Sequence, residues 1–197
     1  MQEIRAFIAL ELPVEIKSLL SGVLGELAFH HQKAVKWVNP DGIHLTLKFL
    51  GNIPPSKVSP IADVMAQASR DYEVFDLELK GLGAFPNVRS PRVVWVGIGG
   101  DIHGVVKLQK QIDGGLAPLG FAPEKRAFSP HLTLGRVREK SVSKDRQYLV
   151  EALPSVKIPR ISSFRISRIS LMKSTLTRSG AIYEPLAGFS LDRIRDE

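Results

Sequence analysis

Two kinds of apolar spacing alternate along this chain and predict its strands and helices. Alternation of apolar and polar residues over 74–79 predicts a strand, as does the short apolar run 4–10, with Ile4, Ala6, Ile8 and Leu10 on one face. Apolar residues three or four positions apart after Pro13 and after Ser59 predict helices. The predicted strands cover 4–10, 35–38, 44–50, 74–79, 92–98, 131–137, 156–173 and 181–186, and the predicted helices cover about 13–30, 59–68, 103–117 and 143–153. This mixture predicts an α+β protein.

One four-residue phrase occurs twice, each time inside a predicted strand. His44-Leu45-Thr46-Leu47 is repeated as His131-Leu132-Thr133-Leu134, after the turn signals Asn39-Pro40-Asp41-Gly42 and Ser129-Pro130. Because side chains alternate between the two faces of a strand, each histidine shares a face with its threonine, and the leucines point to the other face. A duplicated scaffold can repeat a phrase for packing alone, but packing needs only the leucines. The polar positions recur as well, so we predict that the two histidines act as a pair.

The repeat also predicts how the chain is organised. Each copy of the predicted unit ends in its His-x-Thr strand, and no linker separates the two copies. We therefore expect residues 1–197 to form a single domain of two pseudo-symmetric lobes with a cleft between them. Two copies are too few for a repeat array.

The composition narrows the partners and the chemistry. The chain has no cysteine, which excludes disulfides, thiolate metal sites and a thiol nucleophile. A net charge of +7 and a pI near 9.8 favour an anionic partner, nucleic acid first, although many basic proteins bind nothing anionic. Neither a signal peptide nor a membrane-length apolar run is visible, so we expect the cytoplasm.

Two imidazoles and two hydroxyls that converge on a cleft suit the cleavage of a phosphodiester without a metal. In-line displacement at phosphorus needs a base on the attacking oxygen and an acid on the leaving oxygen, on opposite sides of the phosphorus. Threonine hydroxyls can hold the non-bridging oxygens. Neither motif contains an aspartate or glutamate for a metal, and the sequence lacks a P-loop, a dinucleotide fingerprint and a nucleophile elbow.

With these motifs, the chain resembles the two-histidine (2H) phosphoesterases. It is most similar to their LigT-like branch, the RNA 2',3'-cyclic phosphodiesterases also described as 2'-5' RNA ligases. Both His-x-Thr-x motifs of that family are intact. The resemblance also covers residues 5–10, Trp37-Val38-Asn39, the segments 83–86 and 92–97, and the last hairpin with Ser174, Gly180 and Tyr183.

The resemblance implies a bilobal α+β fold, with two antiparallel sheets that form a V-shaped cleft and helices on the outside. It implies hydrolysis of a 2',3'-cyclic phosphate to a 2'-phosphomonoester without a metal or cofactor, with 2'-5' ligation as the reverse reaction. His131 would be the proton acceptor that activates water, and His44 the proton donor to O3'. Thr46 and Thr133 would bind the phosphate.

Other residues are weaker candidates for contact with RNA. Strict alternation places Lys48 on the His44 face, whereas Arg136 reaches the His131 face only if its strand bulges. Phe7, Phe85 and Tyr183 can stack on a base, and each has an equally good role in the core. We expect a monomer that acts on RNA ends such as tRNA fragments. The alternatives are a non-catalytic module that binds RNA ends, and a phosphodiesterase for a small cyclic nucleotide or a cyclic ADP-ribose derivative.

Overall fold

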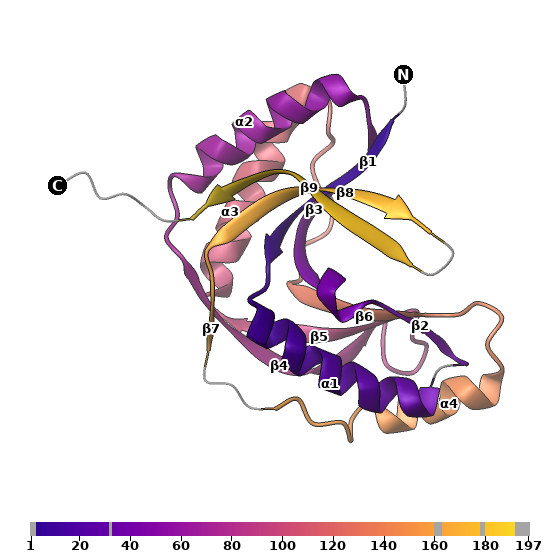
Figure 1. Cartoon of the computed structure of the whole chain (residues 1–197). Coiled ribbons are helices and arrows are strands. Elements are labelled where there is room, and N and C mark those ends of the chain that lie inside the picture. Colours follow the sequence, from indigo (N-terminus) through magenta and orange to yellow (C-terminus); the bar gives the residue numbers. More distant parts are fainter. Residues whose placement is uncertain (1–2, 32, 160–162, 178–179, 192–197) are drawn as a thin grey trace.

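The computed structural model describes residues 3–31, 33–159, 163–177 and 180–191, and within them it has nine strands and four α-helices (Figure 1). The helices are α1 (Val14–His31), α2 (Val58–Ser69), α3 (Ile102–Leu116) and α4 (Ser143–Ala152), with short 3-10 helices η1 (Pro40–Gly42), η2 (Pro55–Lys57) and η3 (Ala117–Leu119). The strands are β1 (Ile4–Glu11), β2 (Val35–Trp37), β3 (His44–Ile53), β4 (Phe75–Phe85), β5 (Val93–Gly100), β6 (His131–Val137), β7 (Phe164–Ile166), β8 (Arg168–Leu176) and β9 (Ala181–Ser190).

The α+β class is confirmed, and the predicted elements differ from the observed ones mainly at their ends. β4 continues to Phe85, beyond the strand predicted over 74–79, because residues up to Phe85 stay paired with β5. The long strand predicted over 156–173 is shorter and divided into β7 and β8. The closing hairpin pairs β8 with β9 as expected; residues 178–179 of its predicted turn lie outside the described residues.

All strands pair antiparallel in one curled sheet with the order β7-β4-β5-β6-β3-β1-β8-β9, and β2 pairs with β6. The two sheets expected from the sequence are thus joined, but only through the register pair Leu45 and Leu132 between β3 and β6. Outward from that seam, β1, β8 and β9 follow β3, and β5, β4 and β7 follow β6, while β2 is a further strand on β6. That residues 1–197 form one domain of two lobes stays a prediction.

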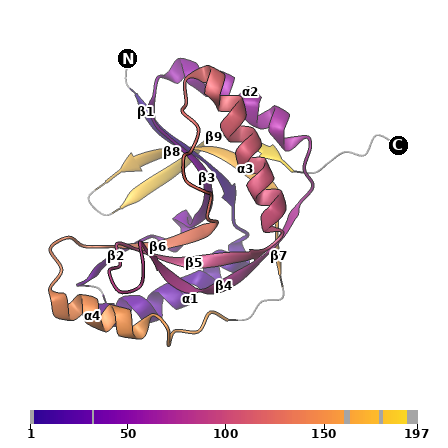
Figure 2. The same cartoon turned by 180° about the vertical axis from the view of Figure 1, so that it is seen from behind.

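The helices lie in two groups on the outside of the curled sheet. α2 and α3 lie side by side against the half that contains β8 and β9 (Figures 1 and 2). α1 and α4 contact each other at the opposite end, where α1 also packs against β2 and η1.

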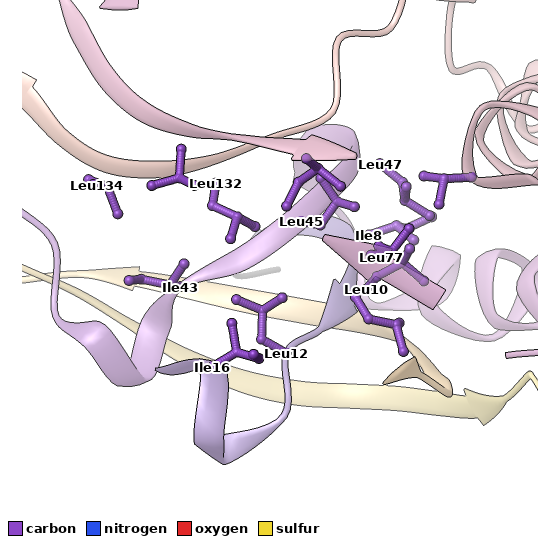
Figure 3. Packing of buried hydrophobic residues seen from close by; sticks show 14 of the residues in the cluster. Ile8, Leu10, Leu12, Ile16, Ile43, Leu45, Leu47, Leu77, Leu132 and Leu134 are labelled. Atoms are coloured by element: carbon purple, nitrogen blue, oxygen red, sulfur yellow. The ribbon is translucent and has the colours of Figure 1, made fainter. Parts of the chain in front are cut away.

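The leucines of the repeated motif form the centre of the core, as alternation predicts. Leu45, Leu47, Leu132 and Leu134 are all buried, and they pack with residues of β1 and with Ile43 (Figure 3). Burying one leucine side chain stabilises a fold by about 1.5–3 kcal/mol. The apolar half of the motif therefore fixes the two strands that carry the polar half.

Candidate active site

The two His-x-Thr strands lie next to each other at the middle of the sheet. β3 and β6 are antiparallel, and Leu45 is opposite Leu132. Extending this register by one residue in each direction places His44 opposite Thr133, and Thr46 opposite His131. The two histidines are then diagonal neighbours on one face, with Cα atoms about 7–8 Å apart in such a pair. The structure thus brings together all four residues that the sequence selects.

Each imidazole is held by a backbone carbonyl two residues earlier. Nδ1 of His44 donates a hydrogen bond to the carbonyl oxygen of Gly42 at 2.7 Å, and Nδ1 of His131 donates to that of Ser129 at 2.7 Å. A carbonyl can only accept, so Nδ1 carries the proton in both rings. Nε2 is consequently the atom that can accept or donate a proton in each ring. Both turns are visible in the sequence, but their role as imidazole anchors is not.

Two aromatic rings hold the imidazole of His44. Phe7 stacks on it with ring centroids 4.5 Å apart, and Tyr183 meets it edge-on at 5.1 Å. Tyr183 also packs against Gly42, where a Cβ atom would lie 3.0 Å from the phenol ring. Phe7 is only 3% exposed, so the prediction that it contacts RNA is wrong. Its ring supports His44 instead.

His131 has its own pair of aromatic neighbours, from β4 and β5. Phe85 meets it edge-on at 4.9 Å, and the Trp95 ring lies 6.4 Å away. Trp95 lies flat over Gly83, where any Cβ atom would overlap its ring. Sequence reasoning left Phe85 between two roles and did not select Trp95 for the site. Trp95 belongs to the site because the register of β5 with β6 places it opposite Thr133.

The surroundings of His44 make its imidazole hard to protonate. The pKa of His44 is lowered from 6.5 to about 4, chiefly by burial and to a smaller extent by the positive charge of Lys17. The hydrogen bond to Gly42 acts in the opposite direction because it favours the charged ring. At neutral pH, therefore, His44 is uncharged in the unliganded protein.

This pKa predicts that stability falls with pH between 6.5 and about 4. In that window the unfolded chain protonates His44 while the folded protein does not, so the free energy of unfolding decreases as the pH is lowered. The loss attributable to His44 amounts to about 3 kcal/mol at pH 4. Urea unfolding of the wild type and of His44→Gln at pH 7.5, 5.5 and 4 measures it, because the variant lacks this component. Parallel pH dependence in the two proteins would contradict the prediction.

A β-bulge moves Lys48 away from the site, and its predicted place on the His44 face is wrong. Thr46 pairs with Ala9 and Lys48 with Ile8, so Leu47 is an extra residue on β3 and the alternation shifts by one. Lys48 is 5% exposed, and its Nζ donates to Asp113 Oδ1 at 2.5 Å and to the Ala122 carbonyl at 2.7 Å. It therefore ties β3 to α3 and is not available to RNA.

The same bulge in β6 turns Arg136 toward the site. Thr133 pairs with Trp95 and Gly135 with Val94, so Leu134 is the extra residue. Arg136 is exposed, and the bulge places it on the His131 face, as predicted for a bulged strand. Burial raises the pKa of the Tyr183 phenol, and the charges of Arg136 and Arg5 oppose that rise. Both arginines thus lie close enough to act on Tyr183.

A cavity of about 340 Å³ opens beside His44. Its lining includes Glu11, Lys17, Asn39 and Tyr183 together with His44, whereas His131 does not line it. Glu11 accepts hydrogen bonds from Ser170 and from Arg168, which fixes this wall to β8. The volume is in the range of small-molecule sites, and polar and apolar side chains both line it.

Two further observations concern only the described part of the chain. No three side chains among the histidines, aspartates and glutamates there are grouped so that they could hold a metal ion. None of the described helices is both long and apolar enough to cross a membrane.

Paired His-x-Thr strands with both imidazoles anchored through Nδ1 define an acid–base site of the two-histidine class. The chain belongs to the family of LigT-like phosphoesterases, whose family model matches residues 10–95 and 102–183. A curated relative, the RNA 2',3'-cyclic phosphodiesterase of Methanothermobacter thermautotrophicus, is 35% identical over 96% of this chain and 100% of its own length.

Solved structures give the same fold. Escherichia coli LigT in complex with 3'-AMP aligns with a TM-score of 0.72 at 28% identity, over 95% of this chain and 98% of that one. A Thermus thermophilus protein aligns with a TM-score of 0.76 at 25% identity, over 97% and 99%. The antiparallel sheet and its outer helices are therefore shared along nearly the whole chain.

Proposed function

We propose that this protein is an RNA 2',3'-cyclic phosphodiesterase, a phosphoric diester hydrolase that opens a 2',3'-cyclic phosphate to a 2'-phosphomonoester. One observation carries the proposal: two imidazoles on adjacent antiparallel strands are both anchored through Nδ1, so that each has Nε2 for proton transfer. The relative from Methanothermobacter thermautotrophicus bears this activity in its name.

The proposed reaction uses the two histidines on opposite sides of the phosphorus. Nε2 of His131 accepts a proton from water, whose oxygen forms the new bond to phosphorus. The bond from phosphorus to O3' breaks, and Nε2 of His44 gives that oxygen its proton. Thr46 and Thr133 share the face of the histidines, and their hydroxyls donate to the non-bridging oxygens.

The low pKa of His44 requires that the substrate supply the conditions for its protonation. A proton donor must hold its proton at the working pH, and a neutral imidazole cannot donate from Nε2. A bound phosphodiester anion stabilises the imidazolium and so raises the pKa of His44. We therefore infer that His44 takes up its proton when the substrate binds. The bound phosphate raises the pKa of His44, whereas burial lowers it.

The surroundings of the two histidines support a proposal for how the rest of the substrate binds. O3' leaves on the His44 side, so the terminal nucleoside occupies the 340 Å³ cavity there, against Tyr183. Arg136 contacts the phosphate charge from the bulged end of β6. Escherichia coli LigT has been crystallised with 3'-AMP, a nucleotide that would fit such a cavity. The sequence leads to four further predictions: natural substrates such as tRNA fragments, reversal to 2'-5' ligation, a cytoplasmic location and a monomeric state.

The test is turnover of cyclic phosphate ends in excess EDTA. A 2',3'-cyclic mononucleotide and a short RNA with the same end should both yield only the 2'-phosphate, identified by chromatography against both isomers. A 3'-phosphate product would reverse the assignment of the leaving oxygen, and inhibition by EDTA would contradict the metal-free mechanism. Turnover of the mononucleotide alone would favour a small-nucleotide phosphodiesterase. RNA binding without any product would favour the end-binding module.

A further inference from the structure

Of the two bulges in β3, at Leu47 and at Leu50, the first gives the two side chains that follow it the reverse of their usual environments. Lys48 is 5% exposed, while Phe49 is 62% exposed. Without the extra residue at Leu47, regular alternation would expose the lysine and bury the phenylalanine. A buried lysine needs a partner, which Asp113 provides, and an exposed phenylalanine forgoes about 1.5–3 kcal/mol of burial. Stability alone does not account for this arrangement.

The second motif shows what position the bulge creates. Phe49 follows His44 by five residues, and Arg136 follows His131 by five. Both come directly after the pair of buried residues at a bulge, and both are exposed. The bulges therefore place one side chain per motif strand on the site face beyond its threonine. On β6 that side chain is a cation, and on β3 it is an aromatic ring.

The neighbours of Phe49 belong to the site as well. Phe49 pairs with Phe7 across β1 and β3, and their ring centroids are 6.2 Å apart. Phe7 in turn stacks on His44. One step further along β1, Arg5 is exposed on the same face as Phe7 and acts on the phenol of Tyr183. An exposed ring beside a cation, next to a phosphodiester site, matches the pattern of single-stranded nucleic-acid grooves.

We propose that Phe49 is a stacking platform for a nucleobase of the RNA chain beyond the cyclic end, and that it sets a preference for oligoribonucleotides over mononucleotides. The terminal nucleoside already has the cavity beside His44, so the base on Phe49 belongs to a neighbouring nucleotide. Arg5 provides a cation for the connecting phosphate. This inference rests on the proposed function and deepens it. The face-on contact is sequence-tolerant, because every base has a π-face.

The experiment compares kcat/KM for a 2',3'-cyclic mononucleotide with that for a hexaribonucleotide ending in the same cyclic nucleotide. Phe49→Leu keeps an apolar side chain but removes the ring, and it should lower the ratio of oligonucleotide to mononucleotide kcat/KM by about 5- to 100-fold. Phe49→Tyr keeps the ring and should retain the wild-type ratio. Phe29→Leu changes another exposed phenylalanine, 79% exposed on α1, and is the matched control.

Each outcome decides the inference. A lower ratio in Phe49→Leu alone supports stacking. An unchanged ratio in that variant, or an equal fall for both substrates, overturns it, because a merely structural role would affect both. If the wild type turns over neither substrate, the proposed function fails separately. Affinity for the hexanucleotide carrying a 2'-phosphate then decides: weaker binding by Phe49→Leu but not by Phe49→Tyr supports the platform, and equal affinities overturn it.

Discussion

His44→Ala and His131→Ala are each expected to lower kcat on a 2',3'-cyclic phosphate by about 10²- to 10⁴-fold, the usual loss when a general acid or base is removed. Each variant takes away the Nε2 that moves a proton on its side of the phosphorus. The threonines and the cavity beside His44 remain, so KM should change much less than kcat. Steady-state kinetics in excess EDTA, with the wild type at the same pH, measures both constants.

His103→Ala is the matched control for these variants. That histidine is exposed near the start of α3, and its loss should leave kcat within about twofold of the wild type, because it touches none of the site residues described above. The double variant His44→Ala/His131→Ala should lose little more than the slower single variant, since the two groups act as a unit. Near-normal kcat in either single variant would remove that histidine from the mechanism.

Asp113→Ala is expected to destabilise the protein by about 3–5 kcal/mol, the usual loss when one partner of a buried ion pair is removed. The substitution leaves the ammonium group of Lys48 buried, with the Ala122 carbonyl at 2.7 Å and the Glu124 carboxylate at 3.7 Å as its remaining partners. It also removes the acceptor of the Glu124 backbone N–H, which donates to Asp113 Oδ2 at 2.8 Å. Urea unfolding at pH 7.5 gives the change in the free energy of unfolding.

Two further variants separate a buried charge from lost packing. Lys48→Met/Asp113→Leu removes both charges and should recover most of the stability lost in Asp113→Ala, because a buried ion pair and an apolar pair of similar volume differ little. Arg165→Ala breaks an exposed ion pair, 3.4 Å from Asp76, and should cost less than about 1 kcal/mol. Equal losses for Asp113→Ala and the double variant would mean that packing, not the unpaired charge, dominates.

The central pairing of the fold could be predicted because its information is local. Within the four residues His-Leu-Thr-Leu, alternation predicts that the leucines point to the core and that the histidine and threonine point to the site. Its repetition indicates that the two strands belong to one site. Alternation then gave the faces of His44, Thr46, His131 and Thr133, and the observed register agrees with it.

The bulges could not be predicted because one extra residue leaves no signature in the apolar pattern. The pairs Leu47-Lys48 and Leu134-Gly135 are equally compatible with a regular strand and with a loop. Yet the bulge at Leu47 inverts the positions that follow it up to a second bulge at Leu50, which is why Lys48 was expected in the site and Phe49 was not. The five-residue spacing shared by Phe49 and Arg136 was the available clue.

The aromatic neighbours of the histidines depend on pairings between distant segments. Tyr183 reaches His44 only because β9 pairs with β8 and β8 pairs with β1. Phe85 reaches His131 through β4 and β5. No local pattern encodes such pairings, so sequence reasoning named these rings as candidates without being able to choose between core and site.

The place of β1 in the sheet has a consequence for synthesis of the protein. β1 is among the first segments to leave the ribosome, but its edge is covered by β8; Glu11 and its partner Arg168 are 157 residues apart in the chain. At about 5–20 residues per second, β1 waits roughly 8–30 s with an unpaired, apolar edge. During that interval the nascent chain has no partner of its own for this edge of β1, which leaves the edge open to pairing with other chains.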